Sequence, residues 1–211
     1  FQIHSPFGTA DIKTALHGRF NAFNVTAAVV AVTGLGFSFT EVANAASHLL
    51  PVDGRMQEVK GGSDIRVVVD YAHTPDALAS ALSTLKQSCT GALWVVFGCG
   101  GDRDAGKRPE MGRIADSLAD QLVVTNDNPR SESPEMIAED ILVGITGSAC
   151  HVELDRGAAI RHAVLNARSG DTVLVAGKGH ENYQLVGKNK LDFSDVSCAA
   201  EALREREAAH D

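Results

Sequence analysis

The sequence has no C-x-x-C pair, and its four cysteines, Cys89, Cys99, Cys150 and Cys198, lie far apart. A structural zinc site or a dithiol redox centre usually needs closely spaced ligands, so the spacing disfavours both. Free thiols in a reducing cytoplasm are the simpler expectation. The sequence also has no HExxH motif and no recognisable Ser-His-Asp or Cys-His arrangement, so a hydrolase is not indicated.

Long apolar runs and an excess of basic residues are also missing. No stretch approaches the ~18 apolar residues of a membrane span, and no signal-peptide pattern opens the chain. The formal net charge of −8 argues against a general nucleic-acid or membrane-surface binder, because such binding needs a basic face. Any anionic ligand must therefore be met by a local group of cations. The 211 residues are 44% hydrophobic, which is enough for a sizeable core. The chain opens at Phe1 rather than Met, so we expect a fragment of a longer protein.

The first fifty residues predict two helices without an accompanying β-α-β unit. The first helix has an apolar stripe of Val25, Ala28, Val29 and Val32. The second has Thr40 as its N-cap and a face of Val42, Ala45, Ala46 and Leu49. We expect these helices to be the tail of a domain whose body lies upstream. The turn formers of Pro51-Val52-Asp53-Gly54 then mark a boundary, so we predict domains at 1–52 and 53–211.

From residue 65 onward, short apolar runs alternate with amphipathic helical patterns. The runs are Ile65–Val69, Leu93–Phe97, Gln121–Val124, Cys150–Leu154 and Thr172–Ala176. The helical stripes between and after them include Leu78, Ala81, Leu82 and Leu85; Met111, Ile114, Ala115 and Leu118; Ile160, Ala163, Val164 and Ala167; and Val196, Ala199, Ala200 and Leu203. This alternation predicts an α/β fold with a doubly wound, mostly parallel sheet covered on both faces. A turn at Gly187–Lys190 predicts an added hairpin at the edge.

Polar residues gather directly after the predicted strands. The third run is followed by Thr125-Asn126-Asp127-Asn128-Pro129-Arg130-Ser131, which offers an acid, amides and a guanidinium. Asp70 and His73 follow the first run, a glycine-rich segment 98–108 follows the second, and Gly177–Glu181 follows the last. Loops at the carboxyl edge of an open α/β sheet are where such folds bind ligands. We therefore expect these loops to converge on one cleft.

Two of these loops are ambiguous when taken alone. Gly101 to Lys107 spells G-x-x-x-x-G-K, but Arg108 replaces the Ser or Thr that should hold magnesium, so a flexible loop presenting Arg103 and Lys107 to an anion is preferred. In Gly177-Lys178-Gly179-His180-Glu181, Glu181 suits an ammonium group, and Lys178 or His180 suits a phosphate or carboxylate. Plain turns remain the alternative for both loops. For Tyr71, packing is a sufficient explanation.

Taken together, these segments resemble the C-terminal domain of the MurE-type Mur ligases. The motifs occur in the family's order: Asp70-Tyr71-Ala72-His73-Thr74-Pro75-Asp76, Gly98–Asp104, Lys107-Arg108-Pro109, Asp127-Asn128-Pro129-Arg130 and Gly177–Glu181. Gly18–Asn24 and Gly54-Arg55-Met56 resemble the end of the family's central ATPase domain and the hinge after it. The resemblance therefore implies a Rossmann-like C-terminal domain at 53–211, preceded by a remnant of the ATP-binding domain at 1–52.

The resemblance implies an ATP-dependent ligase of peptidoglycan synthesis, acting in the cytoplasm in cell wall biogenesis, cell shape and cell division. In that family ATP phosphorylates a glutamate carboxylate of UDP-N-acetylmuramoyl-L-alanyl-D-glutamate, and an incoming amine attacks the acyl phosphate. By resemblance, Arg103, Asp127, Asn128, Arg130, Gly177 and Glu181 would hold the amino acid, and Asn21, Asn24, Arg55, Asp70 and His73 would lie near the nucleotide. The nucleotide loop, magnesium ligands and modified lysine belong upstream, so no catalytic or metal-binding residue is expected here.

The Asp-Asn-Pro-Arg pattern is associated in this family with meso-diaminopimelate. That amino acid has a carboxylate beside its far amine, for which Arg130 and Glu181 supply a cation and an anion. With lysine, Arg130 would be desolvated without a partner, which disfavours that substrate. L-Lysine, another diamino acid, a folate-type glutamate or a non-catalytic module descended from a ligase remain alternatives. Val196 stands where the family commonly has Arg, which leaves the role of that edge open.

Overall fold

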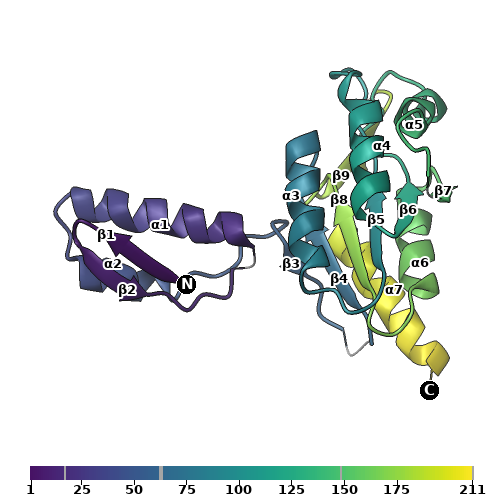
Figure 1. Ribbon diagram of the computed structural model, residues 1–211. Coiled ribbons are helices and arrows are strands. Elements are labelled where there is room, and N and C mark those ends of the chain that lie inside the picture. The colour runs from purple at the N-terminus through teal and green to yellow at the C-terminus, as the bar shows by residue number, and fades with distance from the viewer. Residues whose placement is uncertain (17, 62–63, 148, 211) are drawn as a thin grey trace. The chain divides into compact units, whose positions relative to one another are not determined.

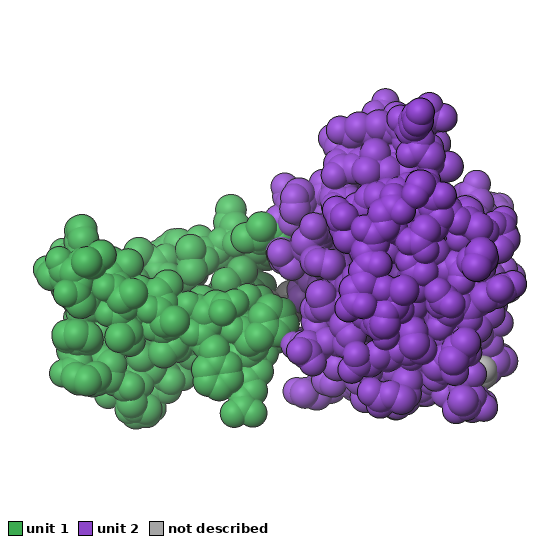
Figure 2. Space-filling view, turned by 90° about the horizontal axis from the view of Figure 1, so that it is seen from above, with its two compact units in different colours: residues 1–52 green, residues 53–211 purple. Residues whose placement is uncertain are grey.

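A computed structural model of the chain describes residues 1–16, 18–61, 64–147 and 149–210. The chain divides into two compact units, Phe1–Val52 and Asp53–Asp211 (Figures 1 and 2). None of the described helices is long and apolar enough to cross a bilayer.

The first unit combines a β-hairpin with two helices. Strands β1 (Gln2–Ser5) and β2 (Gly8–Asp11) pair antiparallel, and helices α1 (Arg19–Gly34) and α2 (Phe39–Ala46) follow. Both helices were predicted from the sequence, but the hairpin was not, because the four-residue strands of the hairpin mix polar and apolar residues without a buried face of any length. A small shared core of apolar side chains holds the unit together, formed by Ile3, Ile12, Val25, Val29, Ala43 and Ala46.

The predicted helical faces of this unit are partly wrong. In α1 the buried residues are Val25, Val29 and Thr33, whereas Ala28 and Val32 are exposed. Because α1 is apolar around much of its circumference, its periodicity did not identify the narrow stripe, one residue per turn, that meets the core.

The second helix also differs from its prediction. Helix α2 follows Ser38 rather than Thr40, and it buries Ala43 and Ala46. Leu49, expected on the buried face, lies beyond the end of the helix and is exposed.

The second unit is built on a six-stranded sheet with the order β3-β4-β8-β5-β6-β7. All neighbouring strands are parallel except the β3–β4 pair, which confirms the mostly parallel sheet. Strands β5 (Leu93–Phe97), β6 (Gln121–Val124) and β8 (Thr172–Ala176) have the predicted bounds, and β4 spans Arg66–Asp70. Strand β7 (Cys150–Val152) is shorter than expected. Strand β3 (Gln57–Glu58) was not predicted, because two residues carry no periodicity.

Helices cover both faces of this sheet, as predicted (Figure 1). Helices α6 (Arg156–Asn166) and α7 (Asp195–His210) share a core with Val67, Val96 and Val175 of the strands. On the other face, α3 (Pro75–Lys86) lies against β5 and β8 and packs on α4 (Lys107–Leu118), which is followed by α5 (Pro134–Leu142).

Side-chain caps fix where several of these helices begin. Thr74 accepts a hydrogen bond from the Ala77 amide, and Asp155 accepts one from the Ala158 amide, so both satisfy amides of a first helical turn. Because α3 and α6 each begin within a few residues of a strand end, the connecting loops are held close to the sheet edge.

The predicted hairpin near the end of the chain is present. Strands β9 (Tyr183–Val186) and β10 (Asn189–Asp192) pair antiparallel across Gly187–Lys188. They form a two-stranded sheet of their own rather than an extension of the main sheet.

Candidate functional site

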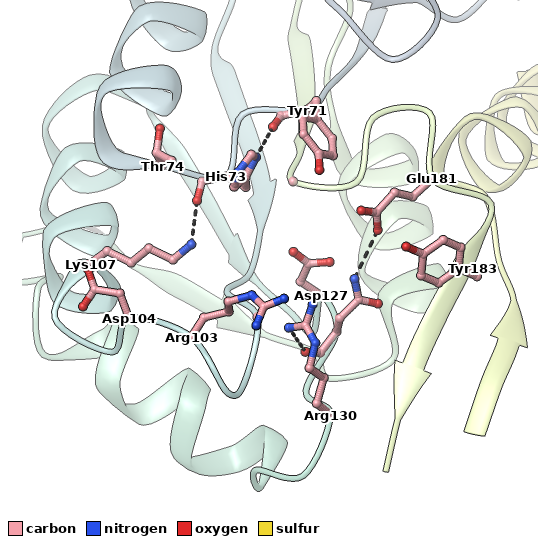
Figure 3. A pocket seen from close by; sticks show the side chains of 13 residues that line it. Tyr71, His73, Thr74, Arg103, Asp104, Lys107, Asp127, Arg130, Glu181 and Tyr183 are labelled. Atoms are coloured by element: carbon pink, nitrogen blue, oxygen red, sulfur yellow. Dashed lines mark hydrogen bonds between the residues drawn. The ribbon is translucent and has the colours of Figure 1, made fainter. Parts of the chain in front are cut away.

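One cavity of about 520 Å³ lies at the carboxyl edge of the main sheet (Figure 3). The loops that follow β4, β5, β6 and β8 all contribute to its wall. The lining residues are Tyr71, His73, Thr74, Gly100, Arg103, Asp104, Lys107, Asp127, Asn128, Arg130, Gly177, Glu181 and Tyr183. The expected convergence of four loops is therefore present in the structure.

The six residues expected at an amino acid all line this cavity. They are Arg103, Asp127, Asn128, Arg130, Gly177 and Glu181. Figure 3 shows the side chains of Arg103 and Arg130 extending toward one another beside Asp127, with Glu181 on the facing side next to Tyr183. The cavity thus offers cations and an anion to one bound molecule, a distribution that suits a ligand carrying charges of both signs.

Arg130 is held in place through both its backbone and its side chain. Its φ of 53° lies in the left-handed region, which is uncommon for a residue other than glycine. The hairpin supports this conformation, because the Arg130 amide donates to the Leu185 carbonyl at 3.1 Å and its carbonyl accepts from the Gly187 amide at 2.7 Å.

The Arg130 guanidinium is oriented by the neighbouring glycine-rich loop. Its Nη1 donates to the Gly101 carbonyl at 2.7 Å and to the Asn128 carbonyl at 3.4 Å. Among the contacts of the described residues, these hydrogen bonds use Nη1 alone, so Nε and Nη2 remain for a carboxylate. An arginine fork that is fixed beforehand loses less conformational entropy when it binds.

Asn128 connects the facing side of the cavity to the hairpin. Its Nδ2 donates to Glu181 Oε2 at 3.1 Å, and its Oδ1 accepts from the Leu185 amide at 2.9 Å. Asn128 is buried, whereas Glu181 is partly exposed to the cavity. The amide therefore positions the Glu181 carboxylate.

Lys178 does not face the cavity as a site for phosphate or carboxylate, which corrects that expectation. Its side chain is fully buried, with Nζ 3.2 Å from Asp127 Oδ1 and 3.4 Å from Glu181 Oε2. No hydrogen bond reaches Asp127 Oδ1 from the described residues, so the Lys178 ammonium is its electrostatic partner there. The buried ammonium is surrounded by Asp127, Glu181 and the amide oxygen of Asn128, which supply the ion pairs and the hydrogen bond that a buried charge requires.

The glycine-rich loop, which was expected to be flexible, is tied to neighbouring loops by side-chain contacts. The Asp102 carboxylate accepts a hydrogen bond from Ser131 Oγ at 2.6 Å, and this contact holds the pKa of Asp102 below its usual range. Glu132 binds the buried Arg108 through Nη2 at 2.8 and 2.9 Å. These contacts tie the loops after β5 and β6 together. The Lys107 ammonium donates to the His73 carbonyl at 2.8 Å, which links the β5 loop to the β4 loop.

The residues expected near a nucleotide do not all lie at the cavity. His73 lines the cavity, and the guanidinium of Arg55 lies 4.7 Å from the centre of the Tyr71 ring. Asp70 is buried and accepts a hydrogen bond from the Met56 amide at 2.7 Å, and burial raises its pKa. Asn21 and Asn24 belong to α1 in the first unit, whereas the residues that line the cavity belong to the second.

Sequence reasoning missed part of the cavity wall. Tyr71, interpreted as a packing residue, lines the cavity, as do Thr74, Asp104 and Tyr183. Tyr71 and Asp104 lie within the sequence motifs described above, so their position next to the predicted site residues could have indicated that they line the cavity. Tyr183 opens the hairpin and carried no such signal.

A buried ion pair beneath the site was also missed. Arg156 and Asp195 are both fully buried, and Arg156 Nε lies 2.7 Å from Asp195 Oδ1. Arg156 also donates hydrogen bonds to the carbonyls of Asn126 and Ala176, each at 3.0 Å. It therefore holds the ends of β6 and β8 together. The start of α7, whose role the sequence left open, is therefore structural: Asp195 pairs with Arg156, and Val196 packs against the core.

The described residues contain no group of three or more His, Cys, Asp or Glu side chains arranged to hold a metal ion.

The chain is similar to known proteins of one family. The family model described as "Mur ligase, glutamate ligase domain" matches residues 54–179. A UDP-N-acetylmuramoyl-L-alanyl-D-glutamate–2,6-diaminopimelate ligase from Chromobacterium violaceum is 52% identical over 203 residues, covering 95% of this chain and 41% of the relative. The enzyme of that name from Geobacillus thermodenitrificans is 46% identical over 208 residues, covering 98% and 42%.

Solved structures give the same picture. The solved structure of a UDP-N-acetylmuramoyl-L-alanyl-D-glutamate–2,6-diaminopimelate ligase matches this chain with 41% identity and a TM-score of 0.72, and the match covers 100% of this chain and 43% of that one. E. coli FolC in complex with ADP matches with 20% identity and a TM-score of 0.67, which shows a shared fold alone. The chain thus spans about two fifths of the length of the relatives it matches.

Proposed function

The chain belongs to the Mur ligase family, and from that premise we propose that it is the amino-acid-binding portion of an ATP-dependent ligase that adds meso-diaminopimelate to UDP-N-acetylmuramoyl-L-alanyl-D-glutamate in peptidoglycan synthesis. The ligase forms an amide bond between a glutamate carboxylate and the incoming amine. Residues 53–211 would be its C-terminal domain and residues 1–52 the end of its central domain, acting in the cytoplasm.

One observation carries the proposal: Arg103, Arg130 and Glu181 line a single cavity although they come from three different loops. Meso-diaminopimelate has an ammonium and a carboxylate at each end, so it needs cations and an anion at matching places. The free donors of Arg130 suit a carboxylate gripped by two parallel hydrogen bonds. Glu181, positioned by Asn128, suits the ammonium beside that carboxylate.

The residues of this chain would hold and orient the amino acid rather than activate it. Fixing the distal carboxylate and ammonium would leave the other amine directed out of the cavity, toward the acceptor carboxylate. Such positioning converts an encounter of two molecules into a reaction within one complex. Arg103 and Gly177, which also line the cavity, would contact the same ligand.

ATP supplies the phosphoryl group that activates the acceptor carboxylate in this family's reaction. Within this chain, Arg55 and His73 are the proposed contacts, since Arg55 stacks on Tyr71 and His73 follows it in the β4 loop. Asp70 would act by fixing the 54–56 turn that carries Arg55. Asn21 and Asn24, which the family resemblance implies as further nucleotide contacts, belong to the first unit. By resemblance to the family, Mg²⁺ would be held by residues of the central domain upstream of this chain.

The substrate proposal is tested by replacing Arg130 with methionine in the full-length protein. We expect kcat/KM for meso-diaminopimelate to fall roughly a hundredfold or more, because a carboxylate would be left without its partner. The value for L-lysine, which has no distal carboxylate, should change far less. The measurement is ligation rate against concentration for both amino acids.

Arg113→Met is the matched control, because Arg113 is an exposed arginine on α4. Its rates should equal those of the unmodified protein. An unmodified protein that prefers lysine would overturn the choice of diaminopimelate, and one that ligates neither amino acid would indicate a non-catalytic module. The isolated 211-residue chain is expected to bind meso-diaminopimelate weakly in calorimetry and to turn over no ATP.

A further inference from the structure

Lys178 is a fully buried charged residue for which the proposed function gives no role. It lies between Gly177 and Gly179, whose φ values of 124° and 54° belong to the region that favours glycine. A Cβ at Gly179 would come within 2.6 Å of the Gly54 carbonyl oxygen and 2.8 Å of Tyr71 Cβ. Gly179 therefore lets the loop pack tightly against Gly54 and Tyr71, while the lysine side chain turns into the protein.

The Lys178 ammonium contacts three side chains of the cavity wall from behind. It donates to Asn128 Oδ1 at 2.9 Å and pairs with Asp127 at 3.2 Å and with Glu181 at 3.4 Å. Because Lys178 is fully buried, these charges interact with little screening by solvent. Each of these partners faces the cavity, so the lysine acts on a ligand through them.

The charges around the cavity are otherwise balanced. Arg103, Lys107 and Arg130 supply three cations to the wall, and Asp104, Asp127 and Glu181 supply three anions. Lys178 adds one further positive charge behind that wall. A doubly zwitterionic diamino acid has no net charge, whereas lysine carries one excess positive charge at neutral pH.

We propose that Lys178 is a positioning residue that sets the charge of the cavity and so selects against amino acids with an unbalanced positive charge. This inference rests on the proposed function and extends it. Arg130 would strengthen the binding of a ligand that has a distal carboxylate. Lys178 would weaken the binding of a ligand that has the distal ammonium without that carboxylate. Both effects favour the same substrate, but they arise from different residues and are separable by mutation.

The test measures kcat/KM for meso-diaminopimelate and for L-lysine with Lys178→Met in the full-length protein. We expect the ratio of the two values to fall roughly tenfold, because removing a buried charge several ångströms away favours the cationic amino acid. The fall should reside in KM rather than kcat. Lys188→Met is the matched control, since Lys188 is exposed in the hairpin turn, and its ratio should not change.

Lys178→Gln separates charge from hydrogen bonding, because glutamine retains a donor for Asn128. It should show the same shift in selectivity as Lys178→Met. An unchanged ratio in both variants, or failure of both to fold in circular dichroism, overturns the inference and leaves Lys178 a purely structural residue. Failure of the proposed function is distinguishable, because the unmodified protein would then show no preference for meso-diaminopimelate.

Discussion

Two aspartates of the second unit have pKa values shifted in opposite directions, and each shift has a consequence for stability. Burial raises the pKa of Asp70, although the Met56 amide partly opposes that shift. The hydrogen bond from Arg206 lowers the pKa of Asp64. A raised pKa means that the folded protein holds its proton longer, so stability falls as pH rises through that range. A lowered pKa has the opposite effect.

We predict that Asp70→Asn stabilises the second unit relative to the unmodified protein as pH rises above about 4, the ordinary value of an unfolded aspartate. Asparagine still offers an oxygen to the Met56 amide but has no charge to desolvate. Asp64→Asn is the opposite-sign control: because the folded pKa of Asp64 is lowered, this variant should lose stability relative to the unmodified protein as pH rises through the range below about 4. Urea unfolding at a series of pH values measures both. Equal pH dependence in the two variants would contradict the assignment.

At this scale the sequence identifies the charged residues of the cavity but not how they pair. Arg103, Arg130 and Glu181 were predictable because each lies in a polar loop directly after a strand. That Lys178 and Arg156 point inward was not, since burial of a charge depends on partners distant in sequence, such as Asp127 and Asp195. The flanking glycines of Lys178 signalled a special backbone without indicating its direction.

The β9–β10 hairpin is the element that supports the cavity from outside the main sheet. Gly187 donates its amide to the Arg130 carbonyl and adopts a φ of 58°. Open space surrounds the position of its missing Cβ, so alanine fits there but is strained by the backbone.

We predict that Gly187→Ala costs about 1 kcal/mol of stability and raises KM for the amino acid several-fold, because the backbone that holds Arg130 is disturbed. Gly170→Ala is the comparison. Gly170 also has a positive φ, 85°, but it precedes β8 at the opposite edge of the sheet. It should lower stability without changing KM. Thermal unfolding and steady-state kinetics measure the two effects, and a KM unchanged by Gly187→Ala would argue against support by the hairpin.

Elements of the main sheet were largely predictable from sequence. Strands β5 and β8 are continuous apolar runs bounded by turn formers, which is typical of strands buried on both faces. The β1–β2 hairpin and β3 were not predicted, because they are short and their pairing is decided by tertiary contacts rather than by local pattern. The buried face of α1 was predicted wrongly for the same reason, because the residues that α1 buries are decided by the small core that it contacts.

The whole molecule consists of two units of very different size and core. The first has 52 residues and a small cluster of six buried apolar side chains, two of which are alanines. A unit of that size buries too little apolar surface to be robust by itself. The second unit contains the main sheet, its covering helices and the complete cavity wall.

We predict that residues 53–211 fold cooperatively when produced alone. Their urea midpoint should be close to the midpoint at which the second unit unfolds in the 211-residue chain. Residues 1–52 alone should show no cooperative transition, because about 1–2 kcal/mol of backbone entropy per residue exceeds what so small a core offsets. Circular dichroism during urea titration checks both pieces. Loss of folding in 53–211 would show that its stability depends on the first unit.

The strand order has a consequence for how the protein is made. Strand β8 lies between β4 and β5, yet it is the last strand of the main sheet to leave the ribosome. Until it emerges, the nascent chain carries β4 and β5 with facing edges that have no neighbour, which are the surfaces through which chains self-associate. Synthesis interrupted before Thr172 should therefore release aggregating polypeptide rather than a smaller folded domain.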